Sequence, residues 1–231
     1  MKKIFTTDLD GTVVYSQNHT FTADKTLVET HKDYTAYMNK RLHDNLAEYN
    51  EKIPFIPVTT RALDEYQRIQ FPITPSYALV LNGAVLLKDG VVDEAWTEAS
   101  RNLIRNEVDE LEKAQSLIDD MNSEGEYPTI ISRERDGFFI FVKTNYVPET
   151  IQLLKDNLDM SKVDVYNKKS KIYVIPKSLS KGVAIKRLKR LLEVDYVIAA
   201  GDSDIDKPML VAADEIIMCD DLKEKGVYIY E

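Results

Sequence analysis

Cysteine, internal repeats and long apolar runs are scarce or missing in this sequence of 231 residues. Because Cys219 is the single cysteine, no disulfide can form within the chain. The single cysteine, together with the lack of a signal-peptide pattern, leads us to expect a reducing, cytoplasmic location. No apolar stretch approaches the roughly 18 residues that a membrane span needs, so we expect no membrane partner.

Positive charge is in the minority, because 30 Lys and Arg residues stand against 39 Asp and Glu residues, which gives a formal net charge of −9. A surface that binds nucleic acid needs clustered Lys and Arg to replace counterions, so the excess of acid argues against such a partner. A small anionic substrate is still compatible with this charge, since a local site can be positive while the whole chain is negative. The chain is long enough to bury a substantial core.

The first part of the chain alternates strands and helices, which is typical of an α/β fold. "KIFTTDLDG" reads as a short buried strand that ends at its carboxylates. The apolar spacing predicts a helix over Asp33–Lys52, a strand over Ile53–Val58, a helix in "ALDEYQRI" and a buried strand in "YALVLNGAVLL". The polar segment Tyr15–Lys32 is expected to hold a hairpin or flap, with Thr26–His31 as a strand.

After Trp96 the order of elements changes. We expect a long amphipathic helix over Thr97–Met121, two strands in "PTIISRERDGFFIFVKT", a helix over Val147–Leu158 and two strands in "VDVYNKKSKIYVIPK". This order indicates an α+β unit. The strand and helix pattern then resumes with "SKGVAIKRLKRLL", "DYVIAAGDSDIDKPML" and a final strand in "EIIMCD". The sequence therefore predicts a discontinuous α/β core, residues 1–87 and 178–231, interrupted by an α+β domain, residues 88–177.

Polar side chains gather where the expected strands end or the expected helices begin: Asp8 and Asp10, Thr59 and Thr60, Lys181, and Asp202, Asp204 and Asp206. In an open parallel α/β sheet, ligands bind outside the carboxyl ends of the strands. Converging carboxylates repel one another unless a cation lies among them, and oxygen ligands suit Mg²⁺, which also binds phosphate oxygens. A hydroxyl and an ammonium group could hold the phosphoryl group.

The pair Asp8 and Asp10 fits a two-step phosphoryl transfer. A carboxylate can be the covalent nucleophile that forms an aspartyl-phosphate. Because side chains alternate along an extended chain, the second carboxylate lies on the same side and could protonate the leaving alcohol and later activate water. The alternative for "DLDGT" is a strand running into an ordinary Asp-Gly turn, but the later "GDSDID" and the lysine before it favour catalysis.

The motifs "DLDGT", "TTR", "SKG" and "GDSDID" occur in the order of the haloacid dehalogenase superfamily of phosphotransferases. The chain resembles the branch with a large cap inserted between the second and third motifs, the Cof-type and sucrose-phosphatase-like sugar phosphatases. This resemblance implies a Rossmann-like core with a parallel sheet and an inserted α+β cap domain. It also implies a phosphoric monoester hydrolase whose substrate is a small phosphorylated metabolite, with sugar phosphates as the favoured class.

In the same way, the resemblance implies that Asp8 attacks phosphorus and that Asp10 is the general acid and base. The main-chain carbonyl of Asp10 would also ligate Mg²⁺, the expected cofactor, and Asp8 and Asp202 would bind the ion directly. Asp206 would help to hold it. Lys181 would stabilise charge on the nucleophile and on the phosphoryl group.

Phosphate contacts are expected from Thr59, which the resemblance favours over Thr60 as the residue that binds the phosphoryl oxygen. Relatives often have Thr-Gly-Arg where this chain has Thr-Thr-Arg. Asn82 and Gly83 are expected to lie beside the site, where the chain leaves for the cap.

Two cap arginines, Arg133 and Arg135, are candidates for gripping an anionic substrate, because arginine can bind an anion through two parallel hydrogen bonds. The alternative is that they are solvated residues of a polar turn. Two other functions stay open on the sequence alone: a phosphomutase of sugar phosphates, and a non-catalytic module that binds phosphate or nucleotide. The choice between monomer and homodimer is also open.

Overall fold

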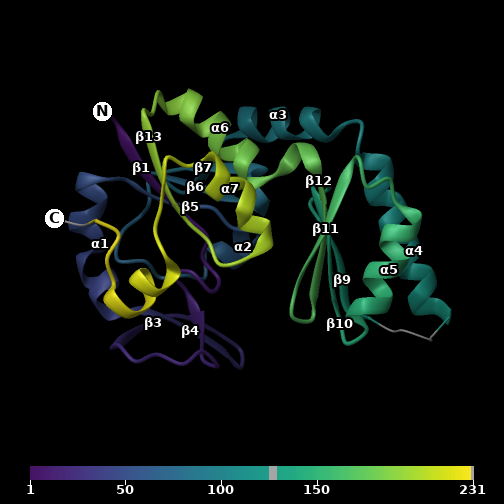
Figure 1. Cartoon of the computed structure of the whole chain (residues 1–231), viewed down its shortest axis with the longest axis horizontal. Coiled ribbons are helices and arrows are strands. Elements are labelled where there is room, and N and C mark those ends of the chain that lie inside the picture. Colours follow the sequence, from purple (N-terminus) through teal and green to yellow (C-terminus); the bar gives the residue numbers. More distant parts are fainter. Residues whose placement is uncertain (125–128, 230–231) are drawn as a thin grey trace. The chain divides into compact units, whose positions relative to one another are not determined.

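The computed structural model describes residues 1–124 and 129–229. The chain forms two compact units, one from Met1–Thr97 with Lys181–Glu231 and the other from Glu98–Ser180 (Figure 1). These bounds lie close to the expected cap of residues 88–177, and the independence of the two units as domains stays a prediction. Within the described residues, no helix has the length and apolar character that a membrane crossing needs.

The first unit is built on a parallel sheet with the order β14-β13-β1-β5. The strands are β1 (Lys3–Thr7), β5 (Phe55–Pro57), β13 (Tyr196–Ala200) and β14 (Glu215–Ile216). β1 lies between β13 and β5, so that Thr7 pairs with Ala200 on one side and with Pro57 on the other. The carboxyl ends of these strands therefore meet at one edge, as the α/β prediction requires. The expected final strand, "EIIMCD", is only two residues long.

Helices and loops cover both faces of this sheet, which explains why its strands read as continuous apolar runs. On one face, α6 (Lys181–Leu192) and α7 (Lys207–Ala212) pack through Ile185, Leu188 and Met209 against the strand residues Ile4, Ile56 and Val197. On the other face, Phe5 stacks on Tyr228 with ring centroids 4.3 Å apart, and Tyr228 also meets Tyr49 of α1 (Lys40–Lys52). The chain around β1 is thereby fixed from both sides.

A second sheet of this unit has the order β6-β7-β8, with β6 (Tyr77–Val80), β7 (Val85–Lys88) and β8 (Val91–Val92) antiparallel. The Asp-Gly signal at residues 89–90 does form the turn between β7 and β8. A helical turn, Leu81–Gly83, joins β6 to β7. In the first turn of α3 (Glu94–Ile104), the indole of Trp96 donates a hydrogen bond to the carbonyl of Gly83 at 3.0 Å. The remaining short helix is α2 (Leu63–Tyr66).

The expected helix over Asp33–Lys52 is wrong in its first part, because Tyr34–Asn39 is strand β4 and α1 begins only at Lys40. β4 pairs with β3 (Lys25–His31) and β2 (Tyr15–Ser16) in the order β2-β4-β3 (Figure 1, purple). The expected strand over Thr26–His31 is thus confirmed, as part of β3. The helix starts where the Asn39 side chain accepts a hydrogen bond from the Leu42 amide, a helix N-cap.

The second unit is an antiparallel sheet with the order β11-β12-β10-β9. Its strands are β9 (Thr129–Arg135), β10 (Phe139–Thr144), β11 (Val163–Lys168) and β12 (Lys171–Pro176). α4 (Val108–Glu124) and α5 (Val147–Asn157) pack on one face of this sheet. The expected single helix over Thr97–Met121 is wrong, since α3 (Glu94–Ile104) and α4 are separate helices. The fold class, a parallel-sheet α/β core with an inserted α+β unit, is confirmed.

Candidate active site

Three carboxylates from two strand ends meet at the edge of the parallel sheet. Asp8 follows β1, and its amide donates to the carbonyl of Ala200 at 2.9 Å, which ties the end of β1 to the end of β13. Asp202 and Asp206 come from the loop after β13. One carboxylate oxygen from each of Asp8, Asp202 and Asp206 lies within 4.8 Å of the other two. This spacing is suitable for a shared cation with oxygen ligands.

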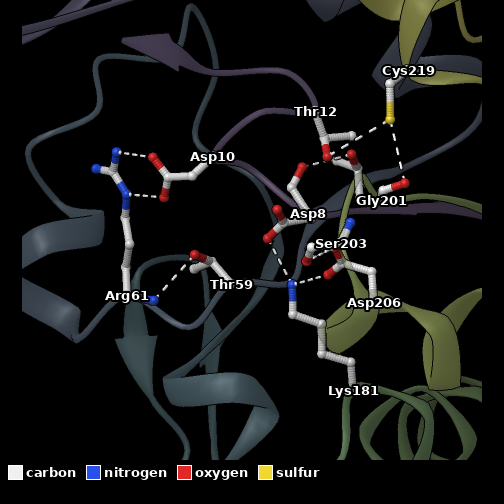
Figure 2. A network of polar contacts seen from close by, with 11 residues as sticks. Asp8, Asp10, Thr12, Thr59, Arg61, Lys181, Gly201, Ser203, Asp206 and Cys219 are labelled. Atoms are coloured by element: carbon white, nitrogen blue, oxygen red, sulfur yellow. Dashed lines mark hydrogen bonds and ion pairs between the residues drawn. The ribbon is translucent and has the colours of Figure 1, made fainter. Parts of the chain in front are cut away.

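Lys181 is the first residue of α6 and joins two of these carboxylates (Figure 2). Its ammonium donates to Oδ1 of Asp8 and to Oδ1 of Asp206, each at 2.6 Å. The other oxygen of Asp206 accepts from the amide and the hydroxyl of Ser203, at 3.0 and 2.6 Å. Because the Lys181 side chain is 1% exposed, these contacts are shielded from solvent.

Burial and neighbouring charges shift the pKa values of Asp8, Asp206 and Lys181, with a different balance at each group. Burial raises the pKa of Asp8 above its usual range, Lys181 opposes this shift, and the nearby charge of Asp206 adds to it. Burial alone would raise the pKa of Asp206 too, but the charge of Lys181 and the hydrogen bonds from Lys181 and Ser203 lower it. Burial would lower the pKa of Lys181, yet the two carboxylates outweigh it and raise it, so the ammonium stays charged.

One ammonium therefore stands against three carboxylates. A divalent cation would offset this excess and would favour the ionised form of Asp8. The donor set is all oxygen, which fits a hard cation such as Mg²⁺.

Gly201 allows the approach of Asp206 to this cluster. A Cβ atom at position 201 would lie 2.4 Å from the Cβ of Asp206, a distance that real side chains do not reach. The carbonyl of Gly201 also accepts from the thiol of Cys219 at 3.3 Å. Burial raises the pKa of that thiol, which favours its neutral form.

The carboxylate of Asp10 is turned away from Asp8 toward Arg61 (Figure 2). Nε and Nη2 of Arg61 donate to the two oxygens of Asp10, each at 2.7 Å, in a bidentate pair. The amide of Arg61 donates to the hydroxyl oxygen of Thr59 at 3.1 Å. Arg61 thus links Asp10 to Thr59. The carboxylate of Asp10 lies outside the cluster of Asp8, Asp202 and Asp206. Metal ligation by its main-chain carbonyl stays a prediction.

The other residues expected near phosphate follow β5 and β6. Thr59 is buried two residues after the end of β5, and its carbonyl accepts from the amide of Asn82 at 2.8 Å. Asn82 has φ 60° and Gly83 has φ 92°, so the chain reverses sharply here. Thr60 is partly exposed beside Thr59. The structure therefore brings these four residues into one region of the first unit.

Arg133 and Arg135 lie on strand β9 of the second unit and not in a turn, which corrects their expected place; the turn covers residues 136–138. The guanidinium of Arg135 lies 5.0 Å from the ring centroid of Phe141. Both arginines belong to the second unit, and a role in substrate binding stays a prediction.

Sequence reasoning missed three residues that the structure places around the site: Ser203, Arg61 and Glu29. Ser203 stands inside "GDSDID", where a hydroxyl three residues before Asp206 is a signal for a hydrogen bond of the capping kind. Arg61 closes the "TTR" motif. Glu29 lies in a short strand far from any motif, and the sequence holds no signal for its role.

Comparison with known proteins identifies the family of the chain. Residues 1–230 match the family model described as Sucrose-6F-phosphate phosphohydrolase. No curated protein sequence matches the chain.

Solved structures similar to this chain include the sucrose-phosphatase from Synechocystis sp. PCC6803 in complex with sucrose and phosphate, at 14% identity and TM-score 0.57 over 94% of this chain and 83% of that chain. A haloacid dehalogenase-like hydrolase from B. subtilis gives 15% identity and TM-score 0.57 over 94% and 89%. The IMP-nucleotidase of Plasmodium falciparum gives 14% identity and TM-score 0.61 over 94% and 64%. The chain belongs to the sucrose-6F-phosphate phosphohydrolase family of the haloacid dehalogenase superfamily, and it is a phosphoric monoester hydrolase.

Proposed function

We propose that this protein is a Mg²⁺-dependent phosphatase that hydrolyses a small sugar phosphate through an aspartyl-phosphate on Asp8. The observation that carries this proposal is the buried ammonium of Lys181, held at 2.6 Å between Asp8 and Asp206, with Asp202 completing a cluster suited to a cation. The family description and the sucrose-phosphatase structure support sugar phosphates as the substrate class.

In the first step, a carboxylate oxygen of Asp8 attacks phosphorus and the bond from phosphorus to the ester oxygen breaks. Asp10, once it has taken a proton from solvent, gives that proton to the departing alcohol oxygen. In the second step, Asp10 takes a proton from water, the resulting oxygen attacks phosphorus, and the bond from phosphorus to Asp8 breaks to release inorganic phosphate.

Around this chemistry, Thr59 and Lys181 hold the phosphoryl oxygens, with Thr60, Asn82 and Gly83 beside them. Asp8, Asp202, Asp206 and the carbonyl of Asp10 would hold Mg²⁺, which supplies positive charge against the phosphoryl oxygens. Lys181 supplies further positive charge from a fixed, buried position, so little reorganisation is needed as charge develops.

We expect the purified protein to hydrolyse at least one ester in a panel of sugar phosphates when Mg²⁺ is present, and to lose this activity with EDTA. Release of inorganic phosphate is the measurement, with IMP included as a nucleotide comparison. A phosphomutase would instead convert substrate without releasing stoichiometric phosphate. Folded protein that hydrolyses no ester in Mg²⁺ would contradict the proposal.

We also expect Mg²⁺ to raise the melting temperature of the wild-type protein by several degrees, because a ligand that binds only the folded state stabilises it. Asp202→Asn should lose most of this rise while its melting temperature without metal changes little, since Asp202 is exposed. Thermal denaturation with a Mg²⁺ titration measures both. Asp204→Asn, an exposed carboxylate of the same loop, is the control and should keep the full rise.

A further inference from the structure

The three-stranded sheet β2-β4-β3 places an acidic residue, Glu29, beside Arg61. Arg61 in turn pairs with Asp10, the general acid of the proposed reaction. Glu29 lies on β3 and is 4% exposed. Its carboxylate accepts from Nη1 of Arg61 at 2.8 Å, on the opposite side of the guanidinium from Asp10. Tyr34, on β4 of the same sheet, lies close enough to Arg61, Asp10 and Glu29 for their charges to act on its hydroxyl. Two strands of this sheet therefore meet one arginine.

Arg61 is shared between two carboxylates. Nε and Nη2 serve Asp10, while Nη1 serves Glu29 and the carbonyl of Glu65, the latter at 3.0 Å. The side chain of Arg61 is 10% exposed and that of Glu29 is 3% exposed, whereas that of Asp10 is 39% exposed. Glu29 is thus the buried, fixed partner, and Asp10 is the partner that faces solvent.

This arrangement bears on how Asp10 can act. Both oxygens of Asp10 accept hydrogen bonds from Arg61 in the structure, and Figure 2 shows the carboxylate turned toward the guanidinium. A general acid must come within hydrogen-bond distance of the oxygen that it protonates. At least one oxygen of Asp10 must therefore leave Arg61 during the reaction.

Leaving a buried arginine without a carboxylate is costly, because an uncompensated buried charge is strongly unfavourable. Glu29 removes this obstacle, since Arg61 keeps one ion pair when Asp10 turns to the substrate. The structure pairs Arg61 with two carboxylates, Asp10 and Glu29. If Glu29 were neutral, Asp10 would be the charged one of the two, and Arg61 would hold it more tightly.

We propose that Glu29 is a positioning residue that keeps Arg61 compensated and so lets Asp10 move from Arg61 to the leaving group. This inference rests on the proposed function. Because β3 carries Glu29, this inference gives the sheet β2-β4-β3 a role in the reaction.

Glu29→Gln tests this role, because it removes the charge and keeps the shape. Leaving-group release in a single turnover reports the first step alone, and two substrates separate the possible causes. A sugar phosphate needs a proton on its departing oxygen, whereas p-nitrophenyl phosphate departs as a stable phenolate. We expect release from the sugar phosphate to slow roughly ten- to a hundredfold, the loss that follows from a displaced catalytic group. Release from p-nitrophenyl phosphate should change less than about threefold, because its departure needs no general acid.

The matched control is Glu48→Gln, which removes an exposed carboxylate that pairs with Lys52 and should leave both rates unchanged. Equal slowing of both substrates by Glu29→Gln, or slowing of neither, would overturn the positioning role. Wild-type protein that releases no alcohol from any phosphate ester would instead refute the proposed function itself, and the inference with it.

A crystal structure of the wild-type protein with Mg²⁺ and vanadate is the second measurement, and it decides the matter even if Glu29→Gln does not fold. We expect Asp10 to have left Arg61 and Glu29 to have kept its bond to Nη1. If Asp10 still holds Arg61 with both oxygens, or if Glu29 leaves together with Asp10, the proposal is wrong.

Discussion

Asp8→Asn is expected to abolish turnover of every phosphate ester while the protein stays folded. An amide cannot attack phosphorus, and loss of the nucleophile in a site that acts as a unit should lower kcat at least about a thousandfold. Because burial already disfavours the charge of Asp8, its removal should leave the melting temperature equal to or above that of the wild type. Steady-state phosphate release and thermal denaturation are the two measurements.

The control for this substitution is Asp204→Asn, since Asp204 stands in the metal loop but is exposed and pairs with Lys207. It should keep wild-type kcat. Retained hydrolysis in folded Asp8→Asn would show that another group is the nucleophile and would refute the assignment of the site. Mass spectrometry of rapidly quenched wild-type protein should find the phosphoryl group on the peptide that contains Asp8.

Lys181→Met is the second change with a large expected effect, and it should harm both activity and stability. The ammonium that offsets phosphoryl charge is lost, which should lower kcat by about 10²–10³-fold. Asp8 and Asp206 would then face each other in the interior without their shared partner. Breaking a buried ion pair by removing one member costs about 3–5 kcal/mol. Denaturant unfolding without metal measures this loss.

The pH dependence of the stability loss in Lys181→Met tests whether repulsion between Asp8 and Asp206 causes that loss. Repulsion in Lys181→Met should raise the pKa of the two carboxylates, so the folded variant binds more protons than the unfolded chain. Its stability deficit should therefore shrink as the pH falls from neutral to mildly acidic, and it should shrink also when Mg²⁺ is added. Lys186→Met, an exposed lysine of the same helix, should show neither effect. A deficit independent of pH would point to lost packing instead.

The meeting of the strand ends could be predicted from the sequence because it follows from topology. Buried apolar runs end at Asp8, Thr59 and Asp202, and parallel strands in one sheet present their carboxyl ends at one edge. The position of Lys181 at a helix start was also visible, since a cation is poorly placed there without a carboxylate partner. Local pattern and general topology were therefore sufficient for the centre of the site.

The strand β4 was not predictable by apolar spacing. Tyr37 and Met38 continue the three-to-four spacing of Leu42 and Leu46, so the pattern favours one helix from Asp33. Tyr34–Asn39 instead forms a strand, because β2 and β3 supply hydrogen-bond partners for the backbone of these residues. Tertiary pairing of this kind overrides local periodicity.

The break between α3 and α4 has a similar explanation. No proline or glycine interrupts residues 97–121, so nothing local marks the end of a helix there.

The pair of Arg61 with Glu29 was hidden for another reason, since it joins segments that no motif connects. Long-range pairs of this kind become visible only when the fold places the segments together.

The order of the central sheet also constrains how the protein is made. β1, which Asp8 follows, leaves the ribosome before the inserted α+β unit is made, while its neighbour β13 and the loop with Asp202 and Asp206 come only after that unit. Until then one side of β1 has no strand to pair with, and Asp8 stands without the acidic loop that completes the site. Chains that stop before β13 would lack the acidic loop, and the open edge of their β1 would be free to pair wrongly with other strands.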